Sequence, residues 1–186
     1  MVDVYPLDDL PDVWRLRPRV HRDDRGFFVE HWRKSTYERL GLPELVQDNH
    51  SRSIRWALRG LHFQAPPHAQ GKLVSVMHGR IFDVAVDVRR RSPTFGRWAG
   101  VLLSARSSEQ LWIPPGFAHG FLVLSATADV LYKTSAEYAP GAEGGLAWDD
   151  PDLGIVWPLP LGVTPLISAK DAALPTLSQL ATPFEE

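Results

Sequence analysis

Residues 110–124 read QLWIPPGFAHGFLVL, and two short apolar runs in this stretch, Gln110–Ile113 and Gly120–Leu124, flank a Pro-Pro-Gly turn. Similar runs, separated by turn residues, continue on both sides. Many short runs at such intervals are typical of strands in an antiparallel sandwich or barrel. The further predicted strands are Leu73–Met77, Ile81–Val88, Trp98–Leu103 and Asp129–Thr134, with turns at His78-Gly79-Arg80, Arg91-Ser92-Pro93, Ser104–Ser108 and Ser125–Ala128.

The composition excludes several classes of protein. The 20 Lys and Arg residues nearly balance the 22 Asp and Glu residues, and the net charge of −2 argues against binding to nucleic acid or to an anionic membrane surface. The chain has no Cys, which excludes a disulfide framework, a thiolate zinc site, an iron–sulfur cluster and a cysteine nucleophile.

The length of 186 residues suits one domain, and the chain has neither an internal repeat nor a low-complexity tract. We expect a single domain over residues 1–186, of which about 178–186 form a loose tail. The acidic start lacks the apolar run of a signal peptide, and no run approaches the roughly 20 apolar residues of a membrane span. We therefore expect a cytoplasmic protein.

Helix signals are few. Ser35–Leu40 begins with a Ser three residues before a Glu, the pattern of a capping box, and Gly41 follows as a stop signal. A second short helix is predicted from Ser168, and Pro175 limits its length. The segment Ala139–Pro160 is rich in Gly, Pro, Asp and Trp, and we expect it to be ordered because its large apolar residues need burial.

Two histidines are the first candidates for chemistry, His62 in LRGLHFQ and His119 in PPGFAHGF. Because alternate residues of a strand share a face, His62 and Gln64 are expected to point one way, and Arg59 and Leu61 the other. His62 and Gln64 would then project together into a barrel interior. Taken alone, a His on a strand is more often structural than functional.

Two segments resemble the motifs of the cupin superfamily, a group of small jelly-roll barrels. Residues 114–119 have the Pro-x-Gly-x-x-His form of the second motif, and Gly60–Gly79 resembles the first motif, with His62 at its first His position. Metal-binding cupins continue with a second His and a Glu, where this chain has Gln64 and Lys72. Such a ligand set suits a divalent ion poorly, so the site is expected to hold no metal.

The whole chain resembles the dTDP-4-dehydrorhamnose 3,5-epimerase family, and the resemblance covers about 150 residues in order and spacing. It implies an all-β, cupin-type jelly-roll barrel (a double-stranded β-helix) with a few short helices, and an isomerase without a cofactor. The segments that carry it are DRGFFVE (24–30), QDNHS (47–51), LRGLHFQ (58–64), QGKLV (70–74), IPPGFAHGF (113–121), LYKT (131–134), Glu143-Gly144, WDDP (148–151), Ile155 with Trp157-Pro158, and SAKD (168–171).

The resemblance assigns four catalytic positions. Epimerisation beside a ketone needs a base, an acid and a group that stabilises the enolate oxygen. His62 matches the base and Asp171 the carboxylate that orients it, although Asp171 near Ser168 also fits a helix cap. Lys72 matches the cation beside the carbonyl oxygen, and Tyr132 matches the acid that protonates the enolate from the other face.

The remaining matched positions bind the sugar nucleotide. Arg25 and Arg59 match contacts to the diphosphate, which suits the planar fork of Arg. The resemblance also implies a homodimer in which an N-terminal strand crosses to the partner, so that Arg25 and Glu30 would serve the neighbouring site. The other implied substrate contacts are Gln47, Asn49, His119, Glu143 and Lys170, and Tyr138 is expected to stack on the thymine.

The leading interpretation is conversion of dTDP-4-dehydro-6-deoxy-D-glucose to dTDP-4-dehydro-L-rhamnose. A relative that inverts only C3 would carry the same catalytic side chains and stays an alternative. A sugar-nucleotide-binding protein without activity is disfavoured because His62, Lys72 and Asp171 are all present. A metal-dependent cupin is disfavoured because the only spare His near Gln64, His68, follows two prolines in a predicted loop.

Overall fold

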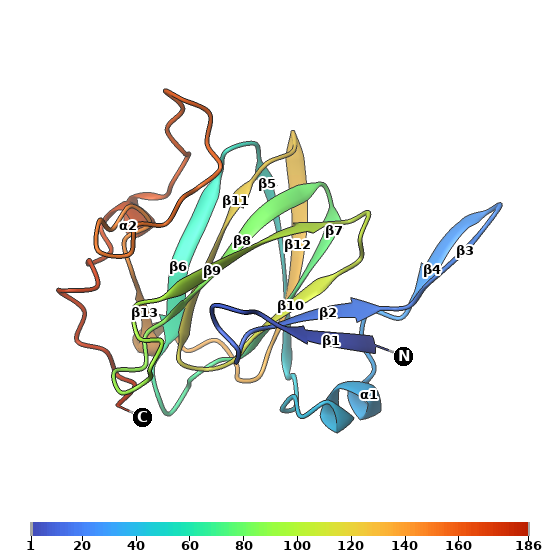
Figure 1. Cartoon of the computed structure of the whole chain (residues 1–186), viewed down its shortest axis with the longest axis horizontal. Coiled ribbons are helices and arrows are strands. Elements are labelled where there is room, and N and C mark those ends of the chain that lie inside the picture. The colour runs from blue at the N-terminus through green and yellow to red at the C-terminus, as the bar shows by residue number, and fades with distance from the viewer. Residues whose placement is uncertain (1, 186) are drawn as a thin grey trace.

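The computed structural model describes residues 2–185, which fold into two facing antiparallel β-sheets (Figure 1). The larger sheet has six strands in the order β1 (Val2–Pro6), β2 (Trp14–Pro18), β10 (Gln110–Ile113), β7 (Lys72–His78), β12 (Thr127–Thr134) and β5 (Gln47–Ile54). The smaller sheet has five, in the order β13 (Glu143–Gly145), β6 (Leu58–Gln64), β11 (Phe117–Val123), β8 (Arg80–Asp87) and β9 (Trp98–Ser104).

The chain crosses between the two sheets at almost every step from β5 to β12, with β8 and β9 as the one consecutive pair in the same sheet. This is the path of a jelly roll. The predicted all-β, cupin-type class is confirmed, and all six strands expected from the apolar pattern are present. β11 begins at Phe117, three residues earlier than predicted.

The apolar pattern did not indicate β5, and its residues explain why. Inward and outward positions alternate along it as in any strand, but the inward ones are Gln47, Asn49, Ser51 and Ser53. A strand that presents polar side chains on both faces has no hydrophobic period to detect. The inward polar row of β5 faces the cavity described below.

Two short helices complete the secondary structure. Helix α1 (Lys34–Arg39) begins one residue before the predicted start, and its N-cap is Arg33 rather than Ser35. The prediction of a capping box at Ser35 is therefore wrong, whereas Gly41, at φ +91°, ends the helix as expected. Helix α2 (Ala169–Ala172) begins directly after Ser168.

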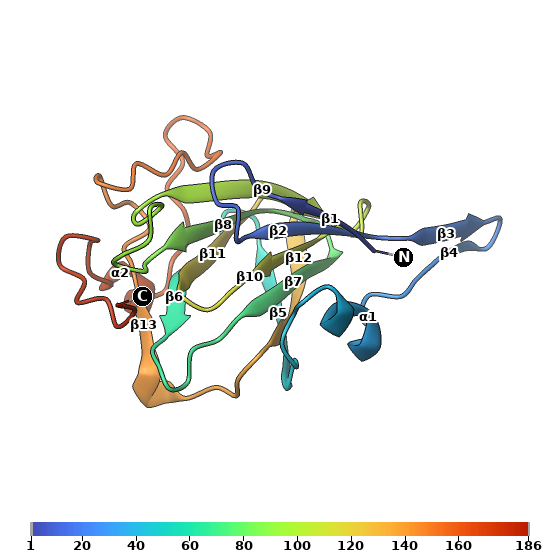
Figure 2. The same cartoon turned by 60° about the horizontal axis from the view of Figure 1, so that its bottom comes forward.

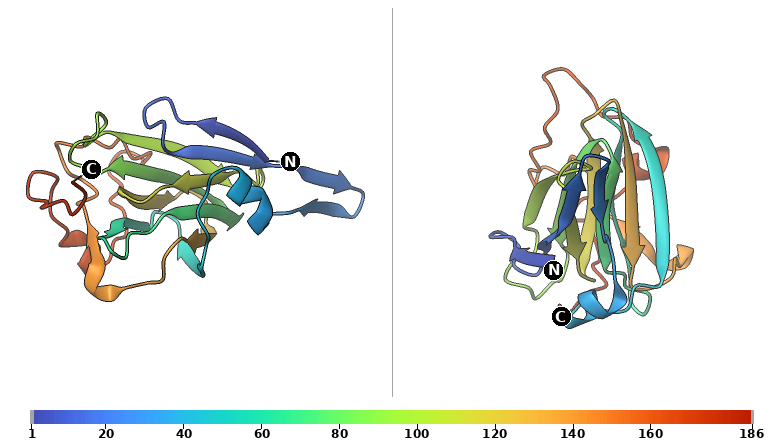
Figure 3. Two further views of the ribbon diagram at one scale, coloured as in Figure 1. Left: turned by 90° about the horizontal axis from the view of Figure 1, so that it is seen from below. Right: turned by 90° about the vertical axis from the view of Figure 1, so that its right-hand side faces the viewer.

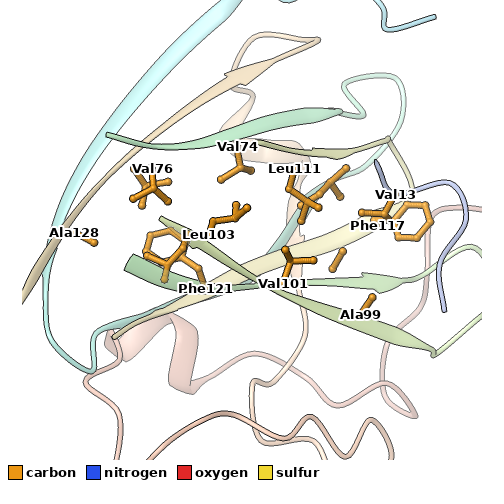
Figure 4. Close-up of a cluster of buried hydrophobic side chains, with 14 of the residues drawn as sticks. Val13, Val74, Val76, Ala99, Val101, Leu103, Leu111, Phe117, Phe121 and Ala128 are labelled. Atoms are coloured by element: carbon orange, nitrogen blue, oxygen red, sulfur yellow. The ribbon is translucent and has the colours of Figure 1, made fainter. Parts of the chain in front are cut away.

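The main core fills the space between the sheets, where the inward side chains of both sheets meet (Figure 4). Val74 and Leu111 contribute from the larger sheet, and Val101 and Phe121 from the smaller one, and each is at most 3% exposed. β11 is buried on both faces: Phe117, Phe121 and Val123 point into this core, and Ala118 and Leu122 point away from it into a second cluster.

The second cluster lies on the outer face of the five-stranded sheet, which the C-terminal part of the chain covers (Figures 1 and 2). Leu146 and Trp157 pack there. The residues expected to form a loose tail, about 178–186, instead pack against the same face where the structure describes them. The hydroxyl of Thr182 donates a hydrogen bond to the Val88 carbonyl. The rings of Phe184 and Phe63 pack edge to face, with their centroids 5.7 Å apart.

One hairpin stands away from the body of the protein. β3 (Val20–Asp23) and β4 (Gly26–Val29) pair only with each other and project beyond the sheets (Figure 3). Phe27 and Phe28 on it are 59% and 70% exposed. Large exposed apolar side chains on a protruding element are typical of an interaction surface.

β6 and β11 approach each other closely at two glycines. A Cβ added to Gly120 would lie 2.6 Å from the carbonyl oxygen of Arg59, and one added to Gly60 would lie 2.6 Å from the Cα of Gly120. Gly60 also has φ +115°, a conformation that other residues rarely adopt. This approach brings the strands that carry His62 and His119 together.

We predict that Gly120→Ala lowers the free energy of unfolding by about 1–3 kcal/mol, because its methyl group meets backbone that cannot move aside. Gly141→Ala is the matched control, since nothing lies within 4 Å of an added Cβ there. The control is expected to stay within about 0.5 kcal/mol of the parent protein in urea denaturation. Equal stabilities of the two variants would contradict the close approach.

Candidate active site

A cavity of about 650 Å³ is lined by side chains from both sheets and from α2. A smaller one of about 270 Å³ adjoins it and shares His62, Lys72, Tyr132 and Glu143. The predicted site residues on the larger cavity are Arg59, His62, Lys72, His119, Tyr132, Glu143, Lys170 and Asp171, and the smaller one adds Gln47, Asn49 and Tyr138.

His62 and Asp171 form the predicted pair. The Nε2 atom of His62 lies 2.8 Å from Oδ1 of Asp171, and the other carboxylate oxygen accepts from the amide of Gly60 at 3.3 Å. A carboxylate that accepts the Nε2 proton leaves Nδ1 as the free base of the ring. Burial lowers the pKa of His62, and Asp171 opposes that shift, so the ring is neutral at pH 7.

Asp171 is not the helix cap that its position also allowed. Ser168 is the N-cap, and its hydroxyl accepts from the amide of Asp171 at 3.0 Å. The carboxylate of Asp171 is only 5% exposed and points to β6. The structure therefore separates the two roles between two residues.

Lys72 lies on β7 with 9% exposure, and its Nζ donates to the carbonyl of His62 at 3.1 Å. In residues 2–185 it forms no ion pair with a carboxylate. Burial lowers its pKa to about 8, a shift that the more distant Asp83 and Glu143 partly offset. Lys72 is thus an ammonium at neutral pH whose charge is poorly balanced, and it can attract an anionic oxygen strongly.

A second histidine–carboxylate pair faces the first. His119 lies directly opposite His62 across β6 and β11, and its Nε2 is 2.7 Å from Oδ1 of Asp83. Asp83 is completely buried, and it was not among the site residues predicted from the sequence. The sequence feature that could have indicated Asp83 is a carboxylate within the apolar strand Ile81–Val88, because a buried carboxylate needs a hydrogen-bond partner.

Tyr132 reaches the cavity from the opposite sheet. It lies on β12 of the six-stranded sheet, while His62 lies on β6 of the five-stranded sheet. Burial raises the pKa of Tyr132, so the phenol keeps its proton at neutral pH. The cavity thus places a free base and a proton donor on its two walls.

The predicted alternation along β6 is wrong at Arg59. Arg59 was expected to face away from His62, yet both line the larger cavity. The reason is a register shift: His62 pairs with His119 and Arg59 with Phe121, so that Gly60 and Leu61 of β6 stand opposite the single residue Gly120 of β11. The Nε of Arg59 donates to the hydroxyl of Ser53 at 2.9 Å, which leaves its terminal nitrogens for a ligand.

The smaller cavity is bounded by a hydrogen-bonded set of polar side chains. The amide of Tyr138 donates to Gln47, and its phenol donates to Glu143, both at 2.8 Å. Lys170 contacts the same oxygen of Glu143 at 2.5 Å. Tyr138 itself is 53% exposed at the rim, where a flat ligand could stack on it.

Gln64 lines the smaller cavity together with His62, as predicted, but both polar atoms of its side-chain amide are hydrogen bonded to backbone groups. Its nitrogen donates to the carbonyls of His68 and Glu137, and its oxygen accepts from the amide of Ala139. Gln64 therefore anchors the loop that carries Tyr138. Within residues 2–185, no group of three or more His, Asp or Glu side chains is arranged to hold a metal ion.

Two predicted binding residues lie outside both cavities. Arg25 is at the tip of the β3–β4 hairpin, 90% exposed, and pairs with Asp23. Glu30 follows the hairpin and pairs with Arg33. Neither lines a cavity that contains His62 in this chain.

Comparison with known proteins agrees with this geometry. Residues 8–179 match the family model described as dTDP-4-dehydrorhamnose 3,5-epimerase. The chain belongs to this epimerase family. The dTDP-4-dehydrorhamnose 3,5-epimerase of Salmonella typhimurium is 53% identical over 172 residues, which are 91% of this chain and 93% of that protein.

Solved structures of epimerases have the same fold. The Legionella pneumophila enzyme, in complex with dTDP-4-keto-L-rhamnose, has a TM-score of 0.91 at 46% identity over 97% of this chain and 95% of that chain. A 3'-monoepimerase from Streptomyces bikiniensis, in complex with dTDP-quinovose, has a TM-score of 0.87 and 36% sequence identity, and the match covers 94% of this chain and 87% of that chain. The epimerase family is one of isomerases, and its recognition from the sequence is confirmed.

As for membranes, none of the helices in residues 2–185 of this epimerase-family chain is long and apolar enough to span one.

We predict that Lys72 titrates near pH 8, well below the other lysines for which a shift is resolved. Hydrogen bonds to Glu44 and Glu143 raise the pKa of Lys34 and Lys170. NMR of reductively methylated protein would measure this, and Lys72→Met would assign the resonance. Asp83→Asn is expected to lower the pKa of Lys72 further, because it removes a nearby negative charge. A Lys72 that titrates above pH 10 would contradict its burial.

Proposed function

We propose that the protein converts dTDP-4-dehydro-6-deoxy-D-glucose to dTDP-4-dehydro-L-rhamnose by inverting C3 and C5. The observation that carries the proposal is the arrangement of three groups on one cavity. His62, paired with Asp171 of α2, lies on one sheet and Tyr132 on the other, and the buried ammonium of Lys72 lines the same cavity. Membership of the epimerase family supports this reaction, and the ligand named for the Legionella structure, dTDP-4-keto-L-rhamnose, is its product.

The first step is removal of a proton beside the C4 ketone. Nδ1 of His62 accepts the proton from the carbon, and the electron pair of the C–H bond becomes the double bond of an enolate. The imidazolium that forms is stabilised by Asp171 at 2.8 Å. General-base catalysis of this kind contributes about 10²- to 10⁴-fold in rate.

The enolate places a negative charge on the C4 oxygen. The ammonium of Lys72 is buried on this cavity and forms no ion pair with a carboxylate in residues 2–185, so its charge is available to that oxygen. His119, whose Nε2 is held by Asp83, lines the same cavity and is assigned below to substrate contact. Fixed donors in a water-poor site stabilise such an oxyanion without reorganising.

Reprotonation completes the inversion. Tyr132 donates its phenolic proton to the carbon from the side opposite His62, and the enolate collapses to the ketone. The phenolate then regains a proton as His62 loses one to solvent, so the enzyme ends in its starting state. The same sequence at C3 and at C5 inverts both centres.

The nucleotide part of the substrate is assigned to the polar rim. Arg59 and Lys170 suit the diphosphate through charge, and Tyr138 suits the thymine through stacking. Gln47, Asn49, His119 and Glu143 are proposed as further substrate contacts. No cofactor enters this mechanism, and the cytoplasmic location expected from the sequence stays a prediction.

We further propose that the enzyme is a homodimer that exchanges its β3–β4 hairpins. The support is the hairpin itself, which pairs with no other strand and exposes Phe27 and Phe28. Arg25 lies at the tip of this hairpin and Glu30 directly after it, and neither lines its own chain's cavity. Exchange would bring both residues to the site of the partner.

Inversion at C3 alone is the alternative. The Streptomyces bikiniensis structure supports this alternative, because that protein is called a 3'-monoepimerase and has the same fold, with a TM-score of 0.87. Both reactions need the same base, acid and cation. They differ in how the sugar ring is seated against His62 and Tyr132.

We predict that the enzyme incorporates deuterium from heavy water at both C3 and C5 of dTDP-4-dehydro-6-deoxy-D-glucose, measured by mass spectrometry and NMR. His62→Ala is expected to abolish incorporation at both carbons while dTDP still binds, because only the base is lost. Uptake at C3 alone would assign the protein to the alternative reaction. Normal turnover by His62→Ala would remove His62 from the base role.

Tyr132→Phe is the matched variant for the opposite wall of the cavity. It should keep His62-dependent exchange while net epimerisation falls about 10²-fold or more, because the proton can no longer arrive from the second face. Equal loss of exchange and epimerisation would show that Tyr132 only positions the sugar.

Hairpin exchange makes a prediction about mixed dimers. Arg25→Ala and His62→Ala are each expected to be nearly inactive alone. In a mixed dimer the Arg25→Ala chain has an intact His62 and receives an intact hairpin from its partner. Random mixing makes half the dimers mixed with one good site each, so activity should recover to about a quarter of the parent value. No recovery after co-refolding would mean that each hairpin serves its own chain.

A further inference from the structure

The residue that orients His62 is carried by a single helical turn. Helix α2 spans only Ala169–Ala172 and contains both Lys170 and Asp171, which line the cavity. A helix of one turn has almost no stability of its own, because nucleation is unfavourable. The position of Asp171 must therefore come from contacts at the ends of the turn and with β6.

Ser168 supplies the contact at the start of the turn. Its backbone is extended, with φ −74° and ψ 156°, and its Oγ accepts the amide proton of Asp171 at 3.0 Å. Its carbonyl accepts from the amide of Ala172, also at 3.0 Å. Ser168 thus binds the turn through both its side chain and its backbone.

The pattern Ser168-Ala-Lys-Asp171 is that of a capping box, in which the acidic residue turns back to the amide of the cap. In this turn the carboxylate of Asp171 does not accept from the backbone amide of Ser168. The carboxylate of Asp171 instead accepts from Gly60 and contacts His62. The side chain of Asp171 is committed to β6, and Ser168 holds its backbone from the other side.

We infer that Ser168 is a positioning residue for the reaction: its hydroxyl oxygen holds the backbone of Asp171 so that the carboxylate meets Nε2 of His62. This inference rests on the proposed function, in which His62 is the base. Loss of the hydroxyl lets the turn loosen, so that the carboxylate spends less time against the ring. The imidazolium formed in the reaction is then less stabilised.

Several charged or titratable groups surround His62 and fix the sign of the effect. Asp171 contacts it from α2, and Glu143 on β13 also favours its protonation, whereas Lys72 on β7 opposes it. Lys170, His119 and Tyr132 line the same cavity. Because Asp171 raises the pKa of His62 against the effect of burial, a looser Asp171 lowers that pKa further.

The test compares Ser168→Ala with Ser168→Thr and Ser168→Asn, since Thr and Asn can also cap a helix and Ala cannot. Ser178→Ala is the control, because the hydroxyl of Ser178 meets only Thr176, away from the cavity. The measurements are kcat and KM for proton exchange, the acidic limb of the pH profile, and the NMR titration of His62.

We expect Ser168→Ala to lower kcat about five- to ten-fold, the factor that corresponds to loss of one cap, with a smaller change in KM. Its acidic limb and the NMR titration of His62 should both move to lower pH. Thr and Asn should restore most of kcat and the parent titration, and Ser178→Ala should match the parent protein throughout.

Three outcomes would overturn the inference. Ser168→Ala could keep the parent kcat and titration, or could lose only thermal stability, which would make Ser168 merely structural. Rescue by Thr but not by Asn would show that the hydroxyl touches the substrate instead. If the parent enzyme exchanges no protons, the proposed function fails, yet the His62 titration still decides whether Ser168 acts on it through Asp171.

Discussion

The buried carboxylate of Asp171 is the constraint on which the rest of the site depends. An ionised carboxyl group removed from water is costly unless it is hydrogen bonded. Asp171 meets this need with Gly60 and His62, from which it is separated by more than a hundred residues along the chain. The C-terminal part of the chain must therefore return to β6, and it does so by packing on the outer face of the five-stranded sheet (Figure 1).

That return also builds the walls of the cavity. Leu61 and Leu146 exchange backbone hydrogen bonds where the C-terminal part meets β6, and β13 continues the pairing beside His62. β13 carries Glu143, which ties Tyr138 and Lys170 together at the rim. A single covering segment thus supplies the partner of the base and much of the nucleotide side of the site.

The two facing sheets divide the chemistry between them. The five-stranded sheet carries both histidines, and the six-stranded sheet carries Lys72 and Tyr132. Groups on one strand could approach a bound sugar only from one side, whereas a cavity between two sheets gives access to both faces of a carbon. The buried ammonium of Lys72, which forms no ion pair within residues 2–185, is unfavourable for folding, and its pKa near 8 reflects that cost.

The fold class and the central strands could be predicted from the sequence, and the family resemblance proposed most of the candidate site residues. The apolar runs predicted the six strands from β7 to β12, because strand periodicity is a local property. The family resemblance pointed to His62, Lys72, Tyr132 and Asp171, and also to Gln47 and Asn49. The apolar pattern could not indicate β5, because polar side chains occupy both of its faces. Tertiary packing was needed to bring Arg59 to His62, to place Asp83 against His119 and to turn the carboxylate of Asp171 to β6 instead of back to its own cap. Each of these depends on a register shift, a cross-strand neighbour or a backbone contact, which arise from how segments pack and not from the order of residues within any one of them.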